Sequence, residues 1–275
     1  MPVQFMNQIL TMAGSDSGGG AGIQADLKTI TMLGAYGASV ITAVTAQNTL
    51  GVKGVYDIPL EGIENQIDTV CQDFQFSAMK TGMLSKKEVV ELITRKIIQY
   101  DLPNVVVDPV MVATSGDLLL QEDAVASVRD HLLPVATLIT PNLQEAEVLS
   151  GEKIETLDDM KRVGSRLIQE LGCKNVLMKG GHLSKMQATD LLCMQDGSYV
   201  TFPGKGIDTK NTHGTGCTLS AALAVFLGKG MDLPDAVKHA KDYLTKALYY
   251  AKEDRLGHGS GPVRHNYVLD PSYSE

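Results

Sequence analysis

Short apolar runs alternate with amphipathic stretches along most of the chain. The runs predict strands at residues 9–13, 39–44, 78–80, 105–107, 136–139, 175–179, 191–194 and 199–202. Apolar residues at helical spacing predict helices at residues 23–33, 60–71, 86–100, 122–133, 157–171, 215–227 and 233–251. Because apolar strands that alternate with helices need cover on both faces, we expect an α/β fold with a mostly parallel central sheet.

Two further features of the pattern concern chain organisation. The segment Gln195–Gly197 has the composition of a tight turn, so it predicts a hairpin between the last two strands. The chain contains no internal repeat, low-complexity tract or linker-like stretch. Residues 1–275 are therefore predicted to form a single domain.

Composition and charge indicate a globular protein and argue against nucleic-acid binding through bulk charge. The hydrophobic set makes up 44% of the 275 residues and charged residues make up 20%. The net charge of −8 argues against a nucleic-acid binder that works through bulk charge. A local loop can still bind a small anion on an acidic protein.

The cysteines and the N-terminus indicate a cytoplasmic protein. The four cysteines are widely spaced, and no C-x-x-C or H-E-x-x-H occurs, which argues against a zinc site or a disulfide framework. Reduced thiols are typical of intracellular proteins. Residues 1–8 do not have the pattern of a signal peptide, and no apolar run reaches the ~20 residues of a membrane span.

The segment Thr212–Cys217 predicts an anion site. It is punctuated by Gly214 and Gly216 and runs directly into an apolar helical stretch. Glycines allow backbone N–H groups to turn toward one point, and the helix dipole adds positive potential there. These surroundings favour a thiolate at Cys217, which could accept a proton from a hydroxyl. The alternative is that Cys217 is a small apolar residue packed at a helix start.

A second glycine-rich loop, residues 14–22, contains five glycines and follows the first predicted strand. It matches neither a Walker A loop nor G-x-G-x-x-G, and it could be only a flexible connection. Asp26 follows in the first helical turn, where it could complement the helix dipole or bind a ligand hydroxyl or amine. Gln47, at the end of the second strand, could read a heteroaromatic ring or could be a solvated loop residue.

Polar residues follow three predicted strands, at Asp108, Asn142 and Lys179. Ligands of open α/β sheets bind at the carboxyl ends of the strands, so we expect these residues at one rim. Asp108 and Glu145 are candidate ligands for Mg²⁺, although Asp108 could only cap a turn and Glu145 could be a helix-surface charge. Lys179, before two glycines, could neutralise a nucleotide phosphate.

With these residues assembled, the chain resembles kinases of the ribokinase-like superfamily. The resemblance is greatest to bacterial hydroxymethylpyrimidine/phosphomethylpyrimidine kinases of thiamine biosynthesis. The matching segments are A-G-S-D-S-G-G-G-A-G-I-Q-A-D-L-K (13–28), T-A-V-T-A-Q-N-T-L-G-V (42–52), K-T-G-M-L (80–84), V-D-P-V-M (107–111), T-P-N-L-Q-E-A-E (140–147), M-K-G-G-H (178–182), N-T-H-G-T-G-C-T-L-S-A-A-L (211–223) and G-H-G-S-G-P-V-R-H (257–265). They occur in order over nearly the whole length.

The resemblance implies a ribokinase-like three-layer α/β/α sandwich and an ATP- and Mg²⁺-dependent kinase. It would phosphorylate the pyrimidine alcohol and its monophosphate, and such enzymes are commonly homodimers. The implied pyrimidine site consists of Gly14, Ala21, Asp26, Gln47, Met83, Val110 and Cys217. The implied ATP site consists of Lys179, Thr209, Asn211, His213, Gly214, Thr215 and Gly216. Asp108 and Glu145 would lie near Mg²⁺, and the backbone of Gly214–Cys217 would form the anion hole for the transferred phosphoryl group.

One position departs from most sugar kinases of the superfamily, which carry Asp as general base where this chain has Cys217. An ordinary thiol is only a few per cent thiolate near neutral pH. A loose phosphoryl-transfer transition state needs positioning and charge stabilisation more than a strong base. We therefore expect the backbone of Gly214–Cys217 to matter more than the thiol. Residues 112–118 are expected to act as a lid.

Two alternatives share these motifs. The first is a pyridoxal kinase, which would be expected to have a second cysteine in the lid and to lack Gln at position 47. The second is a catalytically silent pyrimidine-binding protein, which would be expected to lose the acidic pair or the anion-hole glycines. This chain keeps all of them. The motifs leave the efficiency of the second phosphorylation, a need for K⁺ and the dimer face open.

Overall fold

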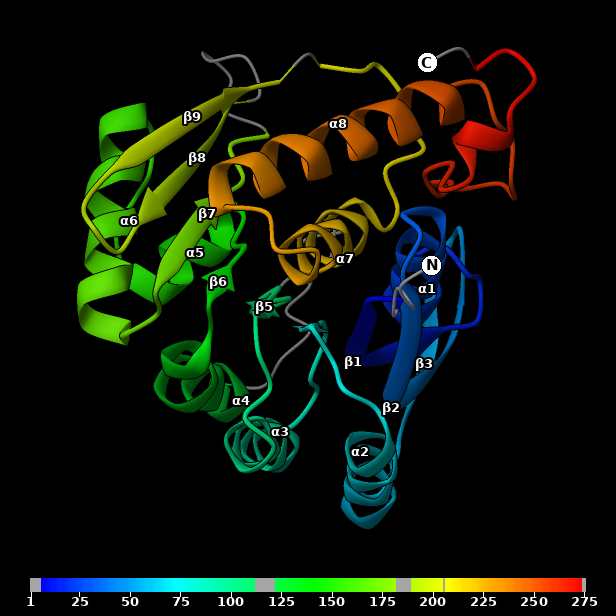
Figure 1. Ribbon diagram of the computed structural model, residues 1–275. Coiled ribbons are helices and arrows are strands. Elements are labelled where there is room, and N and C mark those ends of the chain that lie inside the picture. The colour runs from blue at the N-terminus through cyan, green and yellow to red at the C-terminus, as the bar shows by residue number, and fades with distance from the viewer. Residues whose placement is uncertain (1–5, 112–121, 182–188, 205, 274–275) are drawn as a thin grey trace, which may run out of the picture. The chain divides into compact units, whose positions relative to one another are not determined.

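The computed structural model describes residues 6–111, 122–181, 189–204 and 206–273 (Figure 1). The predicted lid, residues 112–118, lies outside the described residues. The chain forms two units, a first part made of Met1–Lys80 and Ile207–Glu275 and a second part made of Thr81–Gly206. The single-domain organisation stays a prediction, and each part is described by itself below.

The first part has its strands in the order β3-β2-β1-β4. Their bounds are β1 (Gln8–Asp16), β2 (Tyr36–Asn48), β3 (Gly51–Asp57) and β4 (Ala78–Thr81), the last of which ends at the boundary. Strands β1 and β2 are parallel, and β2 and β3 form an antiparallel hairpin. The inner strand β1 is almost wholly buried, whereas β3 is almost wholly exposed. The core of this part therefore lies around β1.

Four helices accompany these strands: α1 (Gly22–Met32), α2 (Leu60–Asp73), α7 (Thr215–Gly228) and α8 (Leu233–Ala251). A 3₁₀ turn, Tyr267–Leu269, follows near the C-terminus. Helix α7 is apolar on every side and contacts α1, α8 and β1 (Figure 1). A helix that is hydrophobic all round is a core helix. The anion-site segment thus leads into the centre of the first part.

The second part has its strands in the order β5-β6-β7-β8-β9. Their bounds are β5 (Val105–Val107), β6 (Leu138–Ile139), β7 (Asn175–Met178), β8 (Thr189–Met194) and β9 (Tyr199–Pro203). Strands β5, β6 and β7 are parallel, and β8 and β9 continue the sheet in antiparallel pairs. The predicted hairpin turn at Gln195–Gly197 is confirmed between β8 and β9.

The helices of the second part are α3 (Lys87–Gln99), α4 (Glu122–Ser127), α5 (Leu143–Ser150) and α6 (Leu157–Leu171). The predicted helix at 122–133 is wrong in its second half: α4 passes into a π-helical turn, Val128–Leu132, and a 3₁₀ turn, Leu133–Val135. Pro134 lies in the 3₁₀ turn and lacks the N–H that a continuing helix needs, which fits the end of the helical segment there. The α/β class itself is confirmed.

Candidate functional site

The glycine loop after β1 folds around the carboxylate of Asp16. Its Oδ1 accepts the N–H of Gly18 at 2.8 Å, and its Oδ2 accepts those of Gly20 at 3.0 Å and Ala21 at 2.9 Å. Asp16 is buried, at 3% exposure. The loop is also drawn tight at Gly22, where a Cβ would lie 2.3 Å from the Gly14 carbonyl oxygen. This loop is therefore ordered by one acidic side chain, and it is not a flexible connection.

The segment predicted to bind an anion lies at the start of α7. Gly214 is the N-cap residue, with a φ of +80°, and as a glycine it has no side chain of its own to cap the helix start. A Cβ on Gly214 would lie 1.9 Å from the Gly20 carbonyl oxygen, so the two glycine loops touch backbone to backbone. The first N–H groups of an α-helix have no partner within the helix, and its dipole makes this end positive. The N-terminal turn, Thr215–Cys217, is thus suited to an anion.

Buried hydrogen bonds hold the start of α7 in place. The Thr218 hydroxyl donates to the Gly214 carbonyl oxygen at 2.8 Å, and the Thr218 Oγ1 lies 3.0 Å from His265 Nε2. His265 comes from the C-terminal segment and is 5% exposed. Burial, and secondarily the charge of Lys28, lowers the pKa of His265 to about 4. The imidazole is therefore neutral near pH 7 and supports the glycine that opens the anion site.

Asp26, predicted to bind the pyrimidine, is fully buried and paired. Lys80 Nζ lies 2.9 Å from both carboxylate oxygens, and the Thr11 hydroxyl donates to Oδ2 at 2.6 Å. Lys80 is also fully buried. Two buried opposite charges with additional hydrogen bonds form a rigid group. The contact of Asp26 with a ring stays a prediction, and the structure adds an interior role that the sequence did not indicate.

Gln47 lies at the end of β2 and contacts the anion loop. Its side chain is 3.0 Å from the Thr45 hydroxyl and 3.4 Å from His213 Nε2. The same imidazole nitrogen is 2.9 Å from Asp16 Oδ2. Thus Gly14, Ala21, Gln47, His213 and the start of α7 form one connected group in the first part of the chain.

The remaining predicted residues of the anion loop fasten it. The Asn211 side-chain amide donates to the carbonyl oxygens of Ala251, at the end of α8, and Asp254. Its backbone N–H donates to the Thr209 hydroxyl at 3.1 Å. Asn211 is buried, at 6% exposure. The structure therefore gives Asn211 and Thr209 a part in holding the loop, and their contact with ATP stays a prediction.

The second part brings Asp108, Glu145 and Lys179 together. Lys179 Nζ lies 3.0 Å from Asp108 Oδ1, which also accepts the Thr140 hydroxyl at 3.0 Å. Burial alone would lower the pKa of Lys179, but the carboxylates of Asp108 and Glu145 outweigh it and raise the pKa. Asp108, Asn142 and Lys179 follow β5, β6 and β7, and the prediction that these three lie at one rim of the sheet is confirmed.

Glu145 is held by its own helix. It forms a capping box at the start of α5, in which the Asn142 N–H donates to Glu145 Oε2 at 2.8 Å and the Glu145 N–H donates to Asn142 Oδ1. Burial raises the pKa of Glu145 to about 7, with Lys179 lowering it and Asp108 raising it. A buried carboxylate whose pKa is raised in this way is a typical feature of a functional site.

The same rim suits a divalent cation. Two neighbouring carboxylates repel each other, and Mg²⁺ commonly binds one or two carboxylates together with phosphate oxygens and water. Within the described residues, no group of three or more His, Cys, Asp and Glu side chains could hold a metal ion. Among the described residues, Asp108 and Glu145 are the carboxylates at this rim, and a pair of this kind fits a metal ion that takes its other ligands from phosphate and water.

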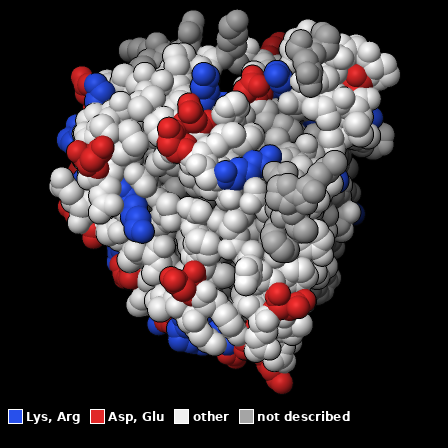
Figure 2. Space-filling view, in the orientation of Figure 1, with Lys and Arg blue, Asp and Glu red and all other residues white. Residues whose placement is uncertain are grey.

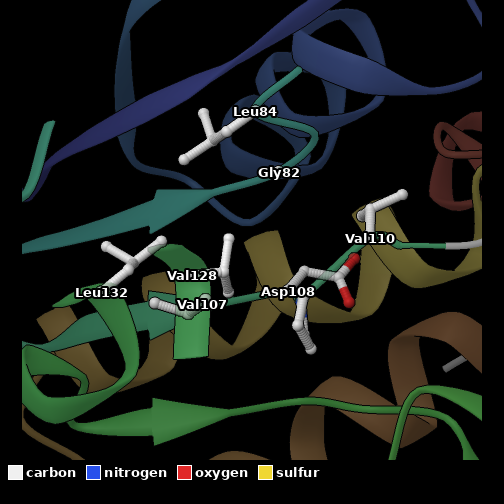
Figure 3. Close-up of a pocket in the computed structure, with 8 residues that line it drawn as sticks. Gly82, Leu84, Val107, Asp108, Val110, Val128 and Leu132 are labelled. Atoms are coloured by element: carbon white, nitrogen blue, oxygen red, sulfur yellow. The ribbon is translucent and has the colours of Figure 1, made fainter. Parts of the chain in front are cut away.

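A small pocket of the second part connects this rim to two further predicted residues (Figure 3). Val110 and Asp108 line it just beyond β5, and Gly82 and Leu84 line it beyond β4. Met83 lies between the last two in the chain. The lining is apolar except for Asp108. Val110 is thus placed beside the carboxylate candidate, and its contact with a substrate stays a prediction.

Sequence reasoning missed four residues that organise these groups: Asp16, Lys80, Thr218 and His265. Each lies in a segment quoted for the resemblance, so the signal was present. None could be assigned a partner, because their contacts join positions up to 197 residues apart.

Comparison with known proteins gives the same assignment as these motifs. A family model described as phosphomethylpyrimidine kinase matches residues 16–264. The hydroxymethylpyrimidine/phosphomethylpyrimidine kinase of Rhizobium meliloti is 50% identical over 256 residues, which cover 93% of this chain and 96% of that protein. The thiamine biosynthesis bifunctional protein of Geobacter sulfurreducens is 47% identical over 94% of this chain, which spans only 52% of that protein's length.

A solved structure supports the fold. The pyridoxal kinase of Staphylococcus aureus, in complex with AMP-PCP and pyridoxal, matches with a TM-score of 0.86, 32% identity and coverage of 98% of this chain and 96% of that one. The ribokinase-like fold is therefore confirmed. The identity to this pyridoxal kinase is well below the 50% of the pyrimidine kinase. The chain belongs to the phosphomethylpyrimidine kinase family.

Proposed function

We propose that the protein transfers the γ-phosphoryl group of ATP to 4-amino-5-hydroxymethyl-2-methylpyrimidine, and then phosphorylates the resulting monophosphate. Family membership supports the acceptor, and the ATP analogue bound by a related kinase supports the donor. The observation that carries the proposal is the start of α7, where a glycine, Gly214, is the N-cap residue and contacts the first glycine loop. Such an end is suited to a phosphoryl group in transfer.

On the acceptor side, we assign the ring to Gly14, Ala21, Asp26, Gln47 and Cys217 of the first part. Glycines allow close approach of a flat ring to the backbone. Met83 and Val110 of the second part would add apolar contacts. Gln47 would supply both a donor and an acceptor, which matches an aminopyrimidine edge.

On the donor side, we assign the nucleotide phosphates to Lys179 and to the segment from Thr209 to Gly216, including Asn211, His213 and Thr215. Asp108 and Glu145 would hold Mg²⁺, which offsets the negative charge of the phosphates when bound. The raised pKa of Lys179 keeps it cationic at neutral pH, so it can balance phosphate charge.

The reaction is an in-line transfer. The hydroxymethyl oxygen forms the new bond to the γ-phosphorus, the bond to the ADP oxygen breaks, and the hydroxyl proton passes to the base, for which we propose the Cys217 thiolate. Backbone N–H groups of Gly214–Cys217 would stabilise the charge on the moving phosphoryl oxygens. They keep their orientation throughout, because Thr218 and His265 hold the Gly214 peptide.

We propose a homodimer, with no nucleic-acid or membrane partner. On the face drawn in Figure 2, acidic and basic side chains are interspersed, and the chain has a net charge of −8. Among the described residues, no helix is long and apolar enough to cross a bilayer. Sedimentation of the purified protein would test the dimer, for which a monomer at micromolar concentration is the contradicting result.

An ADP-release assay tests the proposed activity, with the hydroxymethylpyrimidine, its monophosphate and pyridoxal compared as acceptors. We expect the largest kcat/KM for the pyrimidine, and a larger value for pyridoxal would overturn the assignment. Lys179→Met should abolish ADP release with every acceptor. Lys153→Met, at an exposed lysine of the same part, is the matched control and should leave the rate unchanged.

A further inference from the structure

The hydroxyl of Ser17 holds the main chain of Gln47. Ser17 Oγ donates to the Gln47 carbonyl oxygen at 2.9 Å, and the Gln47 N–H donates to Ser17 Oγ at 2.9 Å. The hydroxyl has one proton to give and lone pairs that can accept, so the two bonds do not compete. Both main-chain polar groups of Gln47 are therefore bonded to one side chain of the first glycine loop.

Gln47 lies at an irregular point of the sheet. The pairing of β2 with the buried strand β1 ends at Thr45, which lies opposite Asp16. On the other side of β2, the pairing with β3 shifts register between Ala46 and Gln47. Irregularities of this kind often direct a side chain toward an active site. Gln47 thus lies beyond the regular pairing with β1, and at this point the Ser17 hydroxyl takes the place of a strand partner.

The glycine loop presents Ser17 in a fixed position. The Gly19 N–H donates to the Asp16 carbonyl oxygen at 2.9 Å, which closes a tight turn with Ser17 and Gly18 at its centre. The Gly18 N–H also donates to Asp16 Oδ1, at 2.8 Å. A Cβ on Gly18 would lie 3.2 Å from the Gln47 carbonyl oxygen, so the glycine lets the loop lie close against β2. The Ser17 hydroxyl therefore connects two ordered segments.

We propose that Ser17 is a positioning residue of the acceptor site, which fixes the main chain of Gln47 and thereby the place from which its amide reaches the acceptor ring. The inference rests on the proposed function, in which Gln47 contacts that ring. Hydrogen bonds are effective only within a narrow range of lengths and angles, so a small shift of the main chain weakens the contact of the amide. A side chain on a loosened main chain also loses more freedom when it binds the ring.

Two substitutions of Ser17 test this role. Ser17→Ala removes both hydrogen bonds, and Ser17→Thr keeps the hydroxyl. The quantities measured are kcat/KM for the hydroxymethylpyrimidine, KM for ATP, and binding of the pyrimidine without ATP by calorimetry. We expect alanine to lower kcat/KM and affinity for the pyrimidine by about 3- to 10-fold, as for the net loss of one hydrogen bond when water replaces the hydroxyl. KM for ATP should stay unchanged, and threonine should keep the wild-type values.

Thr69→Ala is the matched control. The Thr69 hydroxyl donates to the Asn65 carbonyl oxygen on the exposed side of α2, in the same part of the chain. Its removal should leave all three quantities unchanged. Because Ser17 is also exposed, both alanine variants should melt close to the temperature of the wild type. An unfolded Ser17→Ala protein would make the hydroxyl a determinant of folding and would overturn the inference.

A double-mutant cycle with Gln47→Ala separates positioning from direct contact. If Ser17 acts through the side chain of Gln47, Ser17→Ala should cause no further loss of pyrimidine binding in the Gln47→Ala background. An equal loss in both backgrounds would overturn the inference, because Ser17 would then bind the pyrimidine by itself. A loss confined to KM for ATP would overturn it as well, since Ser17 would then be a nucleotide contact.

The same measurements keep the two proposals distinct. A wild-type protein that releases no ADP with the pyrimidine would overturn the proposed function, whatever the Ser17 variants do. A wild-type protein that is active with the pyrimidine, together with a Ser17→Ala variant that binds and phosphorylates it equally well, would overturn only the inference about Ser17.

Discussion

Lys80 and Asp26 form an ion pair in which both side chains are fully buried, with Lys80 Nζ 2.9 Å from each carboxylate oxygen. Removing one partner leaves the other charge buried without compensation, which typically costs about 3–5 kcal/mol. We therefore expect Lys80→Met to lower the free energy of unfolding by roughly this amount in urea titration. The double variant Lys80→Met/Asp26→Leu should recover much of the loss, because it leaves no buried charge.

Lys246→Met provides the matched control for this pair. Lys246 pairs with Asp242 on the surface of α8, where both side chains are largely exposed. Exposed ion pairs contribute little. Unfolding midpoints that fall equally for Lys80→Met and Lys246→Met would contradict the assigned importance of the interior pair.

The histidine behind the anion site predicts how stability depends on pH. His265 has a pKa of about 4 in the folded protein, against 6.5 for an ordinary histidine. The unfolded chain therefore takes up this proton first as the pH falls. The contribution of His265 to the free energy of unfolding is therefore complete above pH 6.5 and is lost as the pH falls from 6.5 to 4. This contribution is about 3 kcal/mol.

The substitution His265→Gln removes that titration and keeps a side-chain amide near Thr218. We expect the variant's free energy of unfolding to fall less than that of the wild type between pH 6.5 and 4. Urea titrations across this range measure both curves. Parallel curves would show that His265 does not contribute to the acid sensitivity.

The sequence predicted the bounds of helices well where the apolar spacing and the capping residues indicated the same start and end. Helix α6 has the predicted bounds, because its apolar spacing is bracketed by a capping box from Thr156 and a left-handed Gly172. Helix α8 likewise begins after the N-cap Asp232. Strand β3 was missed, since its exposed residues lack alternation and it is defined by pairing with β2. Short helix α5 was missed because eight residues give little periodicity.

The sequence predicted that some candidate residues lie near one another, but it did not predict their contacts. The common rim of Asp108, Asn142 and Lys179 followed from the strand ends, because parallel strands bring their carboxyl ends together. The pairing of Asp26 with Lys80 joins positions 54 apart, and no local pattern encodes it. The link from Asp16 to His213 is longer still, so its discovery needed the fold.

Glu145 predicts a conflict between stability and function. Its pKa of about 7 lies above the ordinary 4.5, so its contribution to stability is complete below pH 4.5 and is lost as the pH rises through 7. Glu145→Gln keeps the capping box, which accepts either residue, and removes the charge. At pH 8.5 the variant should unfold at a higher urea concentration than the wild type, and its free energy of unfolding should be larger by up to about 3 kcal/mol. The same variant should lose kinase activity.

Substitution of the neighbouring Glu147 provides the control for the Glu145→Gln experiment. It lies on the same helix, and hydrogen bonds from Lys153 and Ile154 outweigh burial and lower its pKa. Glu147→Gln should therefore be no more stable than the wild type at pH 8.5. A gain in both variants would point to a general effect of charge removal on α5.

The thiol of Cys217 is expected to matter less than the backbone around it. Serine keeps the size and a polar hydrogen but is a much weaker acid. Because positioning and charge stabilisation dominate phosphoryl transfer, we expect Cys217→Ser to lower kcat by no more than ~10-fold. Steady-state kinetics with saturating ATP measure this. A loss above a thousandfold would make the thiolate an essential base.

Alanine substitutions at Gly214 and at Gly230 distinguish the effect of backbone strain from the effect of close packing at the anion site. Both have a φ of +80°, so alanine at either position has a left-handed strain of about 1 kcal/mol. Only at Gly214 would the new Cβ meet another group, the Gly20 carbonyl oxygen at 1.9 Å, whereas Gly230 has open space. We expect both variants to melt at a slightly lower temperature, but only Gly214→Ala to lose roughly 100-fold or more in kcat, because its loop must move away from the transferring phosphoryl group. Equal rates in the two variants would mean that the contact between the glycine loops does not position the anion site.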